Sequence, residues 1–282
     1  MCGIAGYIGA KKAQPILLEI LRRVEYRGYD SAGIATRRPV DGFNLCRETG
    51  KLKKLEEALE ARPLSGTTGI GHTRWATHGD QATVQNAHPH ITGRVALVHN
   101  GTIENYLELK SDLEKLGFTF QSQTDTEVIS ALVSRYLPDS VNPLEATRRA
   151  LQRLKGSYAL CIMFDVDGYN YLVVARNKSP LIIGFATDGT YVASDVDALA
   201  GYVDKVIYLG DEEYGIVGQK GYGFYNLAGM PVQHTTIPVT VQNSEVSKGN
   251  YKHWMQKEIL VTRKNTLSGF GTSCSTTPRM IS

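Results

Sequence analysis

The sequence has few cysteines and no long hydrophobic run. Only four cysteines occur in 282 residues, at positions 2, 46, 161 and 274, and none forms a C-x-x-C pair. Neither a disulfide framework nor a cysteine zinc site is therefore indicated. The longest apolar stretch, residues 158–164, is far shorter than the ~20 residues that cross a bilayer. The N-terminus lacks a basic region followed by an apolar one, so we expect a cytoplasmic protein without a membrane segment.

An excess of charge of one sign is also lacking. The sequence holds 31 basic and 28 acidic residues, which leaves a formal net charge of +3. This balance does not favour a nucleic-acid track or a membrane-surface patch. No internal repeat or low-complexity segment is visible, and 42% hydrophobic residues is typical of a packed globular core.

Four segments have the pattern of amphipathic helices. Apolar residues recur at helical spacing over residues 16–24, with Pro15 in the first turn, and over residues 109–116, which end at Gly117. The T-D-T-E run at 124–127 is typical of a capping box before an apolar segment, and N-P-L-E at 142–145 resembles one. The last helix should stop before Gly156.

Short apolar runs dominate the rest of the chain and predict strands. A strand is expected at residues 2–8, where small and apolar residues alternate. Asp167-Gly168 and Asp188-Gly189 separate later runs at hairpin distances. We expect an α+β fold of two stacked antiparallel sheets covered by helix layers, because several runs are apolar throughout. The other predicted strands are residues 34–35, 68–72, 95–99, 158–164, 171–175, 181–186, 191–194, 206–209 and 214–217.

Cys2 is the most informative position of the sequence. Removal of Met1 would leave a thiol and a free α-amine on one residue. An amine with a pKa near ~8 can accept a proton from a thiol with a pKa near ~8.5, so one residue can supply both nucleophile and base. The alternative is a small second residue that merely suits methionine removal.

Four motifs favour the catalytic interpretation. They are M-C-G-I at 1–4, R-G-Y-D-S-A-G at 27–33, H-T-R-W-A-T-H-G at 72–79 and H-N-G at 99–101. Together they resemble the class II glutamine amidotransferases, which are N-terminal-nucleophile hydrolases. The two middle motifs are similar to the branch that transfers ammonia to fructose 6-phosphate in hexosamine biosynthesis. The resemblance covers residues 1–240 and implies a four-layer αββα sandwich that cleaves L-glutamine to glutamate and ammonia, without a cofactor.

The same resemblance implies roles for residues around Cys2. Asn100 and Gly101 match the pair that stabilises the tetrahedral oxyanion, although Asn-Gly is also a common turn. Arg74 matches the residue that binds the α-carboxylate of glutamine, and its alternative is a surface ion pair. Asp125 matches the residue that binds the α-ammonium, while its place in a capping box offers a purely structural role.

Four further positions complete the implied substrate-binding set. Thr77 and His78 match the loop around the bound amino acid. Trp75 matches a mobile indole that covers the pocket, with an ordinary buried aromatic as its alternative. Arg27 is expected to brace the site around Cys2.

Histidines 72, 78, 88, 90 and 99 raise the question of a metal site. No carboxylate or cysteine accompanies them at a recognisable spacing, and the resemblance gives the H-P-H run at 88–90 a structural role. We therefore expect no metal. Cys161 lies in an apolar run and should be an inert core thiol.

The pattern changes after residue 240. Residues 242–250 are polar and predict a linker, and residues 251–259 resemble the first helix of the sugar-isomerase part of the full-length relatives. Residues 241–282 are thus expected to be a linker and a remnant of that part, in a truncated chain. Fructose 6-phosphate would then be bound only by a missing or separate isomerase domain, and a homodimer is implied for the full-length relatives.

Two alternatives remain open at this point. The chain can be an amidotransferase for another ammonia acceptor, although the sequence of the second motif, R-G-Y-D-S-A-G, argues against this. It can also be a non-catalytic glutamine-binding or regulatory fragment, a state that retention of Met1 would produce.

Overall fold

The computed structural model describes residues 2–76, 79–219 and 221–239 of the chain. Within these residues the four expected helices are present as α1 (Ala13–Val24), α3 (Tyr106–Lys115), α4 (Asp125–Tyr136) and α5 (Pro143–Leu151). A fifth helix, α2 (Leu52–Ala61), was not predicted. Its buried Leu52, Leu55 and Leu59 have helical spacing, so the signal was available in the sequence.

The strands form two antiparallel sheets. The eight-stranded sheet has the order β15-β11-β9-β10-β1-β4-β2-β3, and the seven-stranded sheet has the order β14-β13-β12-β8-β7-β6-β5. The strands of the first sheet are β1 (Gly3–Gly9), β2 (Ser31–Arg37), β3 (Phe43–Thr49), β4 (Thr68–Arg74), β9 (Ile182–Ala186), β10 (Gly189–Ala193), β11 (Lys205–Tyr208) and β15 (Ile237–Pro238). Those of the second sheet are β5 (His90–Thr92), β6 (Val95–Ile103), β7 (Gly156–Phe164), β8 (Leu172–Asn177), β12 (Glu213–Val217), β13 (Tyr222–Asn226) and β14 (Pro231–Val232).

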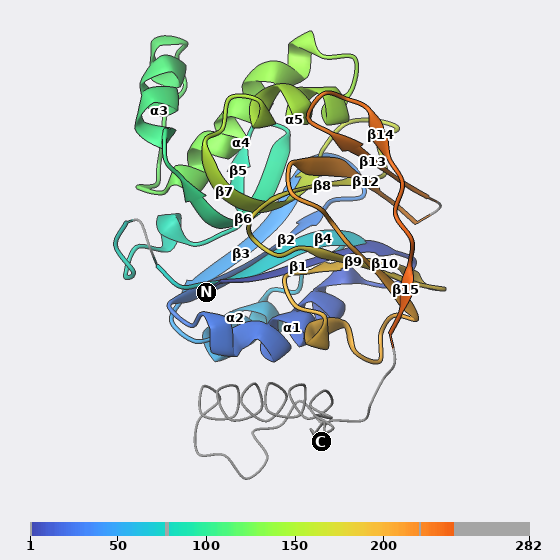
Figure 1. Ribbon diagram of the computed structural model, residues 1–282. Helices are drawn as coiled ribbons and strands as arrows, with labels where there is room; N and C mark the ends of the chain where they lie inside the picture. Colours follow the sequence, from blue (N-terminus) through green and yellow to red (C-terminus); the bar gives the residue numbers. More distant parts are fainter. Residues whose placement is uncertain (1, 77–78, 220, 240–282) are drawn as a thin grey trace, which may run out of the picture. The chain divides into compact units, whose positions relative to one another are not determined.

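Helices cover the outer face of each sheet. The first sheet packs against α1 and α2 through a core that includes Leu17 and Leu55, and the second packs against α4 and its neighbours through a core that includes Leu132. A third core, with Ile70 and Val98, lies between the sheets. Figure 1 shows these four layers, with α1 and α2 below the sheets and α4 and α5 above them. The αββα sandwich is confirmed.

Several boundaries differ from the prediction. The two-residue strand expected at 34–35 is the centre of the seven-residue strand β2, and β3, β5, β13, β14 and β15 were missed. The sequence of β3, F-N-L-C-R-E-T, does not sustain an alternation of apolar and polar residues, and in the structure its residues are half-buried throughout. The turns at Asp167-Gly168 and Asp188-Gly189 do connect antiparallel neighbours, as expected.

The expected capping box at α4 is only half formed. Thr124 accepts the backbone N–H of Glu127 through its hydroxyl, at 3.4 Å. The Glu127 carboxylate, however, accepts the N–H groups of Gln121 and Ser122 and not that of Thr124. These hydrogen bonds hold the preceding loop against the helix, because two backbone N–H groups of the loop donate to the Glu127 carboxylate. The Asn142 cap of α5 is present, with its side chain 2.9 Å from the N–H of Glu145.

No helix among the described residues is both long and apolar enough to cross a membrane. The predicted linker and isomerase remnant at 241–282 lie outside the described residues, so the domain boundary near residue 240 stays a prediction.

Candidate active site

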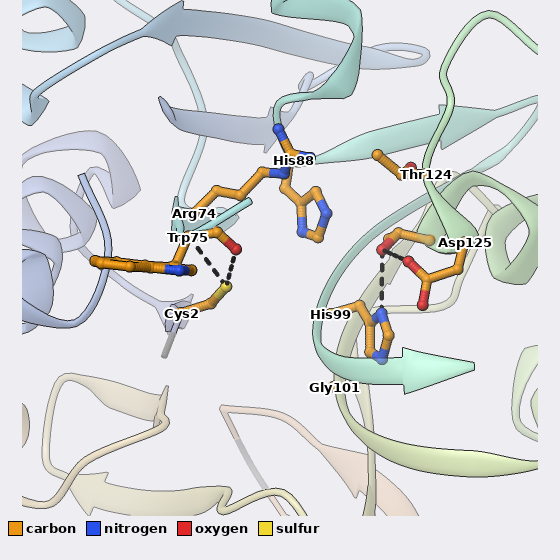
Figure 2. Close-up of a pocket in the computed structure, with 9 residues that line it drawn as sticks. Cys2, Arg74, Trp75, His88, His99, Gly101, Thr124 and Asp125 are labelled. Carbon is orange, nitrogen blue, oxygen red and sulfur yellow. Dashed lines mark hydrogen bonds between the residues drawn. The ribbon is translucent and has the colours of Figure 1, made fainter. Parts of the chain in front are cut away.

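A narrow pocket lies where the two sheets present the ends of β1, β4 and β6 and the start of α4. Figure 2 shows Cys2 and Trp75 on one side of it and Thr124 and Asp125 on the other. Cys2 and Asp125 are more than 120 positions apart in the chain, so only the folding of both sheets brings them together. The lining residues are Cys2, Arg74, Trp75, His88, His99, Gly101, Thr124, Asp125 and Thr126.

The Cys2 thiol is held by the backbone of Trp75. Its Sγ accepts the Trp75 N–H at 3.2 Å and lies 3.4 Å from the Trp75 carbonyl oxygen. Burial raises the pKa of this thiol above its ordinary value, while the Trp75 N–H acts in the opposite direction. Because burial is the larger effect, a nearby base is needed to form the thiolate at neutral pH.

The R-G-Y-D-S-A-G motif clamps the segment that holds Cys2. Asp30 accepts the N–H of Ala76 through Oδ2 at 2.8 Å, and its own N–H donates to the Arg74 carbonyl at 3.0 Å. Gly28 lies against the same segment, and a Cβ there would be 2.8 Å from the Trp75 nitrogen. These contacts explain a glycine and an aspartate to which sequence reasoning gave no role.

Arg74 ends β4 and is 3% exposed, so a surface ion pair is excluded as its role. Burial lowers the pKa of its guanidinium, and the negative charges of Asp30 and Asp125 act against this shift. In Figure 2 the side chain runs along the pocket wall towards His88. A buried cation beside a pocket can attract a carboxylate strongly, because solvent screening is weak there.

Asn100 and Gly101 lie inside strand β6 and do not form a turn, which removes the structural alternative for this pair. The Asn100 Nδ2 donates to the Cys2 carbonyl at 3.0 Å, and its Oδ1 lies 2.9 Å from His72 Nε2. Gly101 has φ +137°, and a side chain there would collide with the Ser157 carbonyl. Only glycine therefore fits this position without strain.

Asp125 faces the pocket from the first turn of α4 and is 4% exposed. Its Oδ2 accepts the N–H of Ile103 at 2.8 Å, and the Thr126 hydroxyl lies 3.4 Å from its Oδ1. Thr126 also lies 3.0 Å from His99 Nδ1. A place in the first turn of the helix and a carboxylate that faces the pocket are thus compatible in one residue.

Of the other four predicted site residues, only Trp75 lines the pocket within the described residues. Trp75 is 45% exposed, with its ring edge-on to Tyr29 at 5.5 Å, so it is not an ordinary buried aromatic. Arg27 does not line the pocket; its guanidinium donates to Asp195 Oδ2 and to the Ser194 carbonyl. Thr77 and His78 lie outside the described residues.

The histidines between the sheets are buried and neutral. His72 and His88 stack at 4.1 Å, and His90 meets His88 edge-on at 4.9 Å. Burial lowers the pKa of all three, that of His72 to about 3. Within the described residues, no three His, Cys, Asp or Glu side chains are arranged to hold a metal ion.

Residues 72–201 match the family model described as a glutamine amidotransferase domain. The chain carries a class II glutamine amidotransferase domain. This confirms the family predicted from the four motifs. The matched segment includes Arg74, Asn100, Gly101 and Asp125, whereas Cys2 precedes it.

Curated relatives extend the match over most of the chain. The glutamine–fructose-6-phosphate aminotransferase (isomerizing) of Bradyrhizobium diazoefficiens is 47% identical over 261 residues, which cover 92% of this chain and 42% of the relative. The enzyme of that name from Thermus thermophilus is 45% identical over 274 residues, covering 95% of this chain and 44% of the relative. The chain thus spans about two fifths of the length of these relatives.

Solved structures agree with the amidotransferase fold. Glutamine phosphoribosylpyrophosphate amidotransferase from B. subtilis superposes with a TM-score of 0.69 and 28% identity, over 80% of this chain and 49% of that one. A glutamine aminotransferase class-II domain protein from Silicibacter pomeroyi, 18% identical with a TM-score of 0.56, shares the fold over 99% of its length.

Proposed function

We propose that this chain hydrolyses the side-chain amide of L-glutamine to glutamate and ammonia, with Cys2 Sγ as the nucleophile. The observation that carries the proposal is the position of the thiol in the pocket. Cys2 Sγ accepts the Trp75 N–H, and the Cys2 carbonyl oxygen accepts an N–H of Asn100 Nδ2. Cys2 therefore contacts residues of both sheets. Arg74 and Asp125 line the same pocket and offer the two opposite charges that an amino acid requires.

Removal of Met1 activates the nucleophile in this proposal. The freed α-amine of Cys2 accepts the thiol proton, directly or through a water molecule, and Sγ attacks the amide carbon. Burial raises the pKa of the thiol, so a base on the same residue replaces the thiolate fraction that burial removes. The developing oxyanion is stabilised by Asn100 Nδ2 and the Gly101 N–H.

The two halves of the reaction then follow. The tetrahedral intermediate collapses, the amine returns the proton to the leaving nitrogen, and ammonia departs with formation of a thioester. Water attacks the thioester, and a second collapse releases glutamate and restores the thiol. The proton that leaves Sγ ends on the departing ammonia, and a proton from water restores the thiol, so the cycle needs no co-reactant besides water.

Substrate recognition is assigned to opposite charges. Arg74 binds the α-carboxylate and Asp125 the α-ammonium of glutamine. The half-exposed Trp75 covers the pocket. Thr77 and His78, which lie outside the described residues, are assigned to substrate binding by the resemblance alone. We assign Arg27 an indirect part, because its ion pair with Asp195 lies beside Ser194, whose hydroxyl accepts the N–H of Ile4.

The acceptor of the ammonia is proposed to be fructose 6-phosphate, as the names of the relatives state for those enzymes. Because the chain spans about two fifths of their length, amination of the sugar is assigned only together with an isomerase domain. Homodimer formation and a cytoplasmic location remain predictions from the sequence.

The test measures glutamate release from glutamine by the purified chain, with and without fructose 6-phosphate, and the intact mass of the same sample. We expect glutamate release, a mass without Met1, and no glucosamine 6-phosphate. A chain that lacks Met1 and binds glutamine but releases no glutamate would contradict hydrolysis and favour the non-catalytic fragment. Retention of Met1 with full activity would contradict the role of the α-amine.

A further inference from the structure

One buried contact joins the two sheets directly behind Cys2. His72 on β4 places Nε2 2.9 Å from Asn100 Oδ1 and 3.0 Å from the His99 carbonyl oxygen, both on β6. Asn100 in turn places Nδ2 3.0 Å from the Cys2 carbonyl oxygen. His72 is fully buried and does not line the pocket, so it does not contact the substrate.

The carbonyl groups of His99 and Cys2 determine where the hydrogens of His72 and of the Asn100 amide lie. The His99 carbonyl can only accept, so His72 Nε2 carries a proton and donates. The Cys2 carbonyl can likewise only accept, so the Asn100 atom that faces it is the amide nitrogen. The Asn100 oxygen must then face His72. These two independent constraints select one tautomer of the histidine and one orientation of the amide.

The other nitrogen of His72 agrees with this assignment. Within the described residues, His72 Nδ1 is buried and has no hydrogen-bond partner. A buried acceptor without a partner is tolerated more readily than a buried donor, so the unprotonated nitrogen is Nδ1. Burial lowers the pKa of His72 to about 3, which leaves the ring neutral with one N–H. Its face is packed against the ring of His88.

We propose that His72 is a positioning residue, whose Nε2–H holds the Asn100 amide with its N–H groups turned towards Cys2 and the oxyanion. Rotation of the amide by half a turn would set two acceptor oxygens against each other at the Cys2 carbonyl. Donation to Oδ1 also polarises the amide and strengthens its N–H donors. This inference rests on the proposed hydrolysis and adds a residue to which the sequence assigned no role.

The first experiment compares His72→Leu with His72→Gln in the full chain, after intact-mass verification that Met1 is absent. Leucine removes the donor, whereas the Gln side-chain amide can place an N–H where Nε2 lies. We expect kcat for glutamine hydrolysis to fall about 10- to 100-fold in His72→Leu, with KM changed less than about threefold. His72→Gln should recover most of kcat.

Leu172→Ala is the matched control for lost stability. Leu172 is fully buried in the same core between the sheets, on β8, and does not line the pocket. This variant should lower Tm while kcat stays within about twofold of the parent. An equal fall of kcat in Leu172→Ala and His72→Leu would assign His72 a merely structural role and overturn the proposal.

A double-mutant cycle tests whether His72 acts through Asn100. In an Asn100→Ala background, His72→Leu should change kcat less than about twofold, because the group that it positions is already absent. A full additional loss in the double variant would overturn the proposal. The γ-aldehyde analogue of glutamine gives a second readout, since Sγ adds to its carbonyl carbon and the thiol proton passes to the oxygen. Its inhibition constant should rise in His72→Leu in proportion to the loss of kcat.

Nitrogen-15 NMR of histidine side chains tests the geometry without turnover. We expect the neutral Nε2–H tautomer of His72 at pH 7 in the parent chain. The Nδ1–H tautomer or a charged ring would overturn the proposal even if every variant failed to fold. A parent chain without glutaminase activity would instead refute the proposed function, so the two failures are distinguishable.

Discussion

The eight-stranded sheet contributes Cys2 and Arg74 to the pocket, and helix α4 contributes Asp125. Asn100 on the seven-stranded sheet does not line the pocket but donates to the Cys2 carbonyl. Cys2 is half-buried and is held by backbone groups of Trp75. Asn100 and Asp125 are buried, and each is held by specific hydrogen bonds to its side chain. In the proposed reaction, the eight-stranded sheet therefore supplies the nucleophile, which needs access. The seven-stranded sheet and α4 supply fixed dipoles and charge, which need rigid support. Variants on the two sides should fail in different ways.

The largest effect is expected from Cys2→Ala, which removes the nucleophile itself. Glutamine hydrolysis should fall at least about 10³-fold, because no other group replaces the attacking sulfur. Glutamine binding, measured by calorimetry, should remain, since the charged groups of the pocket are untouched. Cys46→Ala is the matched control, because Cys46 lies on β3 outside the pocket. Loss of activity in both variants would contradict a special role for Cys2.

Asn100→Ala should give the next largest effect and should appear in kcat. Removal of one oxyanion donor costs about 10²- to 10³-fold in kcat in comparable hydrolases. KM for glutamine should change little, because the ground-state amide needs this donor less than the intermediate does. Steady-state kinetics of glutamate release gives both constants. A rise of KM alone would place Asn100 in binding and not in catalysis.

Asp125→Asn should act mainly on binding and so sharpen the contrast within the second side. Asparagine keeps an oxygen for the Ile103 N–H but loses the charge that pairs with the α-ammonium. KM should rise about 10- to 100-fold, with kcat at saturation within about threefold. As a check on the ligand group involved, an analogue of glutamine without the α-amine should bind both proteins equally. Unchanged KM would leave Asp125 with its helix-start role alone.

The smallest expected effect is that of the buried histidines between the two sheets on the pH dependence of the free energy of unfolding. Burial holds the pKa of His72, His88 and His90 below the value of about 6.5 expected in the unfolded chain. Below that pH the unfolded state binds more protons, so the free energy of unfolding falls as the pH falls from about 6.5 towards 3. Each histidine contributes up to about 1.4 kcal/mol per pH unit.

Urea unfolding at pH 7.5 and 5.5 measures this decline. Replacing His90 by Gln removes one of the three groups and should make the decline shallower. A free energy of unfolding that stays constant between the two pH values would show that these rings are not held neutral in the folded protein.

Local structure was predictable where the signal is local. Helix α1 followed from apolar spacing, and the cap of α5 from Asn142 and Glu145, which lie three residues apart. The same spacing was present in α2 and was overlooked. The second half of the α4 capping box was wrong because Glu127 is used by the preceding loop, a competition that a four-residue pattern does not contain.

The site was predictable in composition but not in arrangement. The motifs indicated Cys2, Arg74 and Asn100, and the family resemblance added Asp125. The pocket contains three of these four as lining residues, with Asn100 bonded to Cys2. The supporting contacts of Asp30 and His72 were missed, because each joins residues that are distant in the chain. His72 was considered only as a metal ligand.

The sequence by itself determined the family and the helical and strand segments with strong periodicity, and it indicated Cys2 as the candidate nucleophile, because these depend on residue type and short-range spacing. Only the tertiary structure decided that Asn100 and Gly101 continue a strand, that Asp30 holds the segment beside Cys2, and that His72 faces the Asn100 amide. The reason is that a hydrogen bond requires its atoms within about 3 Å. That distance across 28 or 73 residues of chain is set by the pairing and stacking of the two sheets.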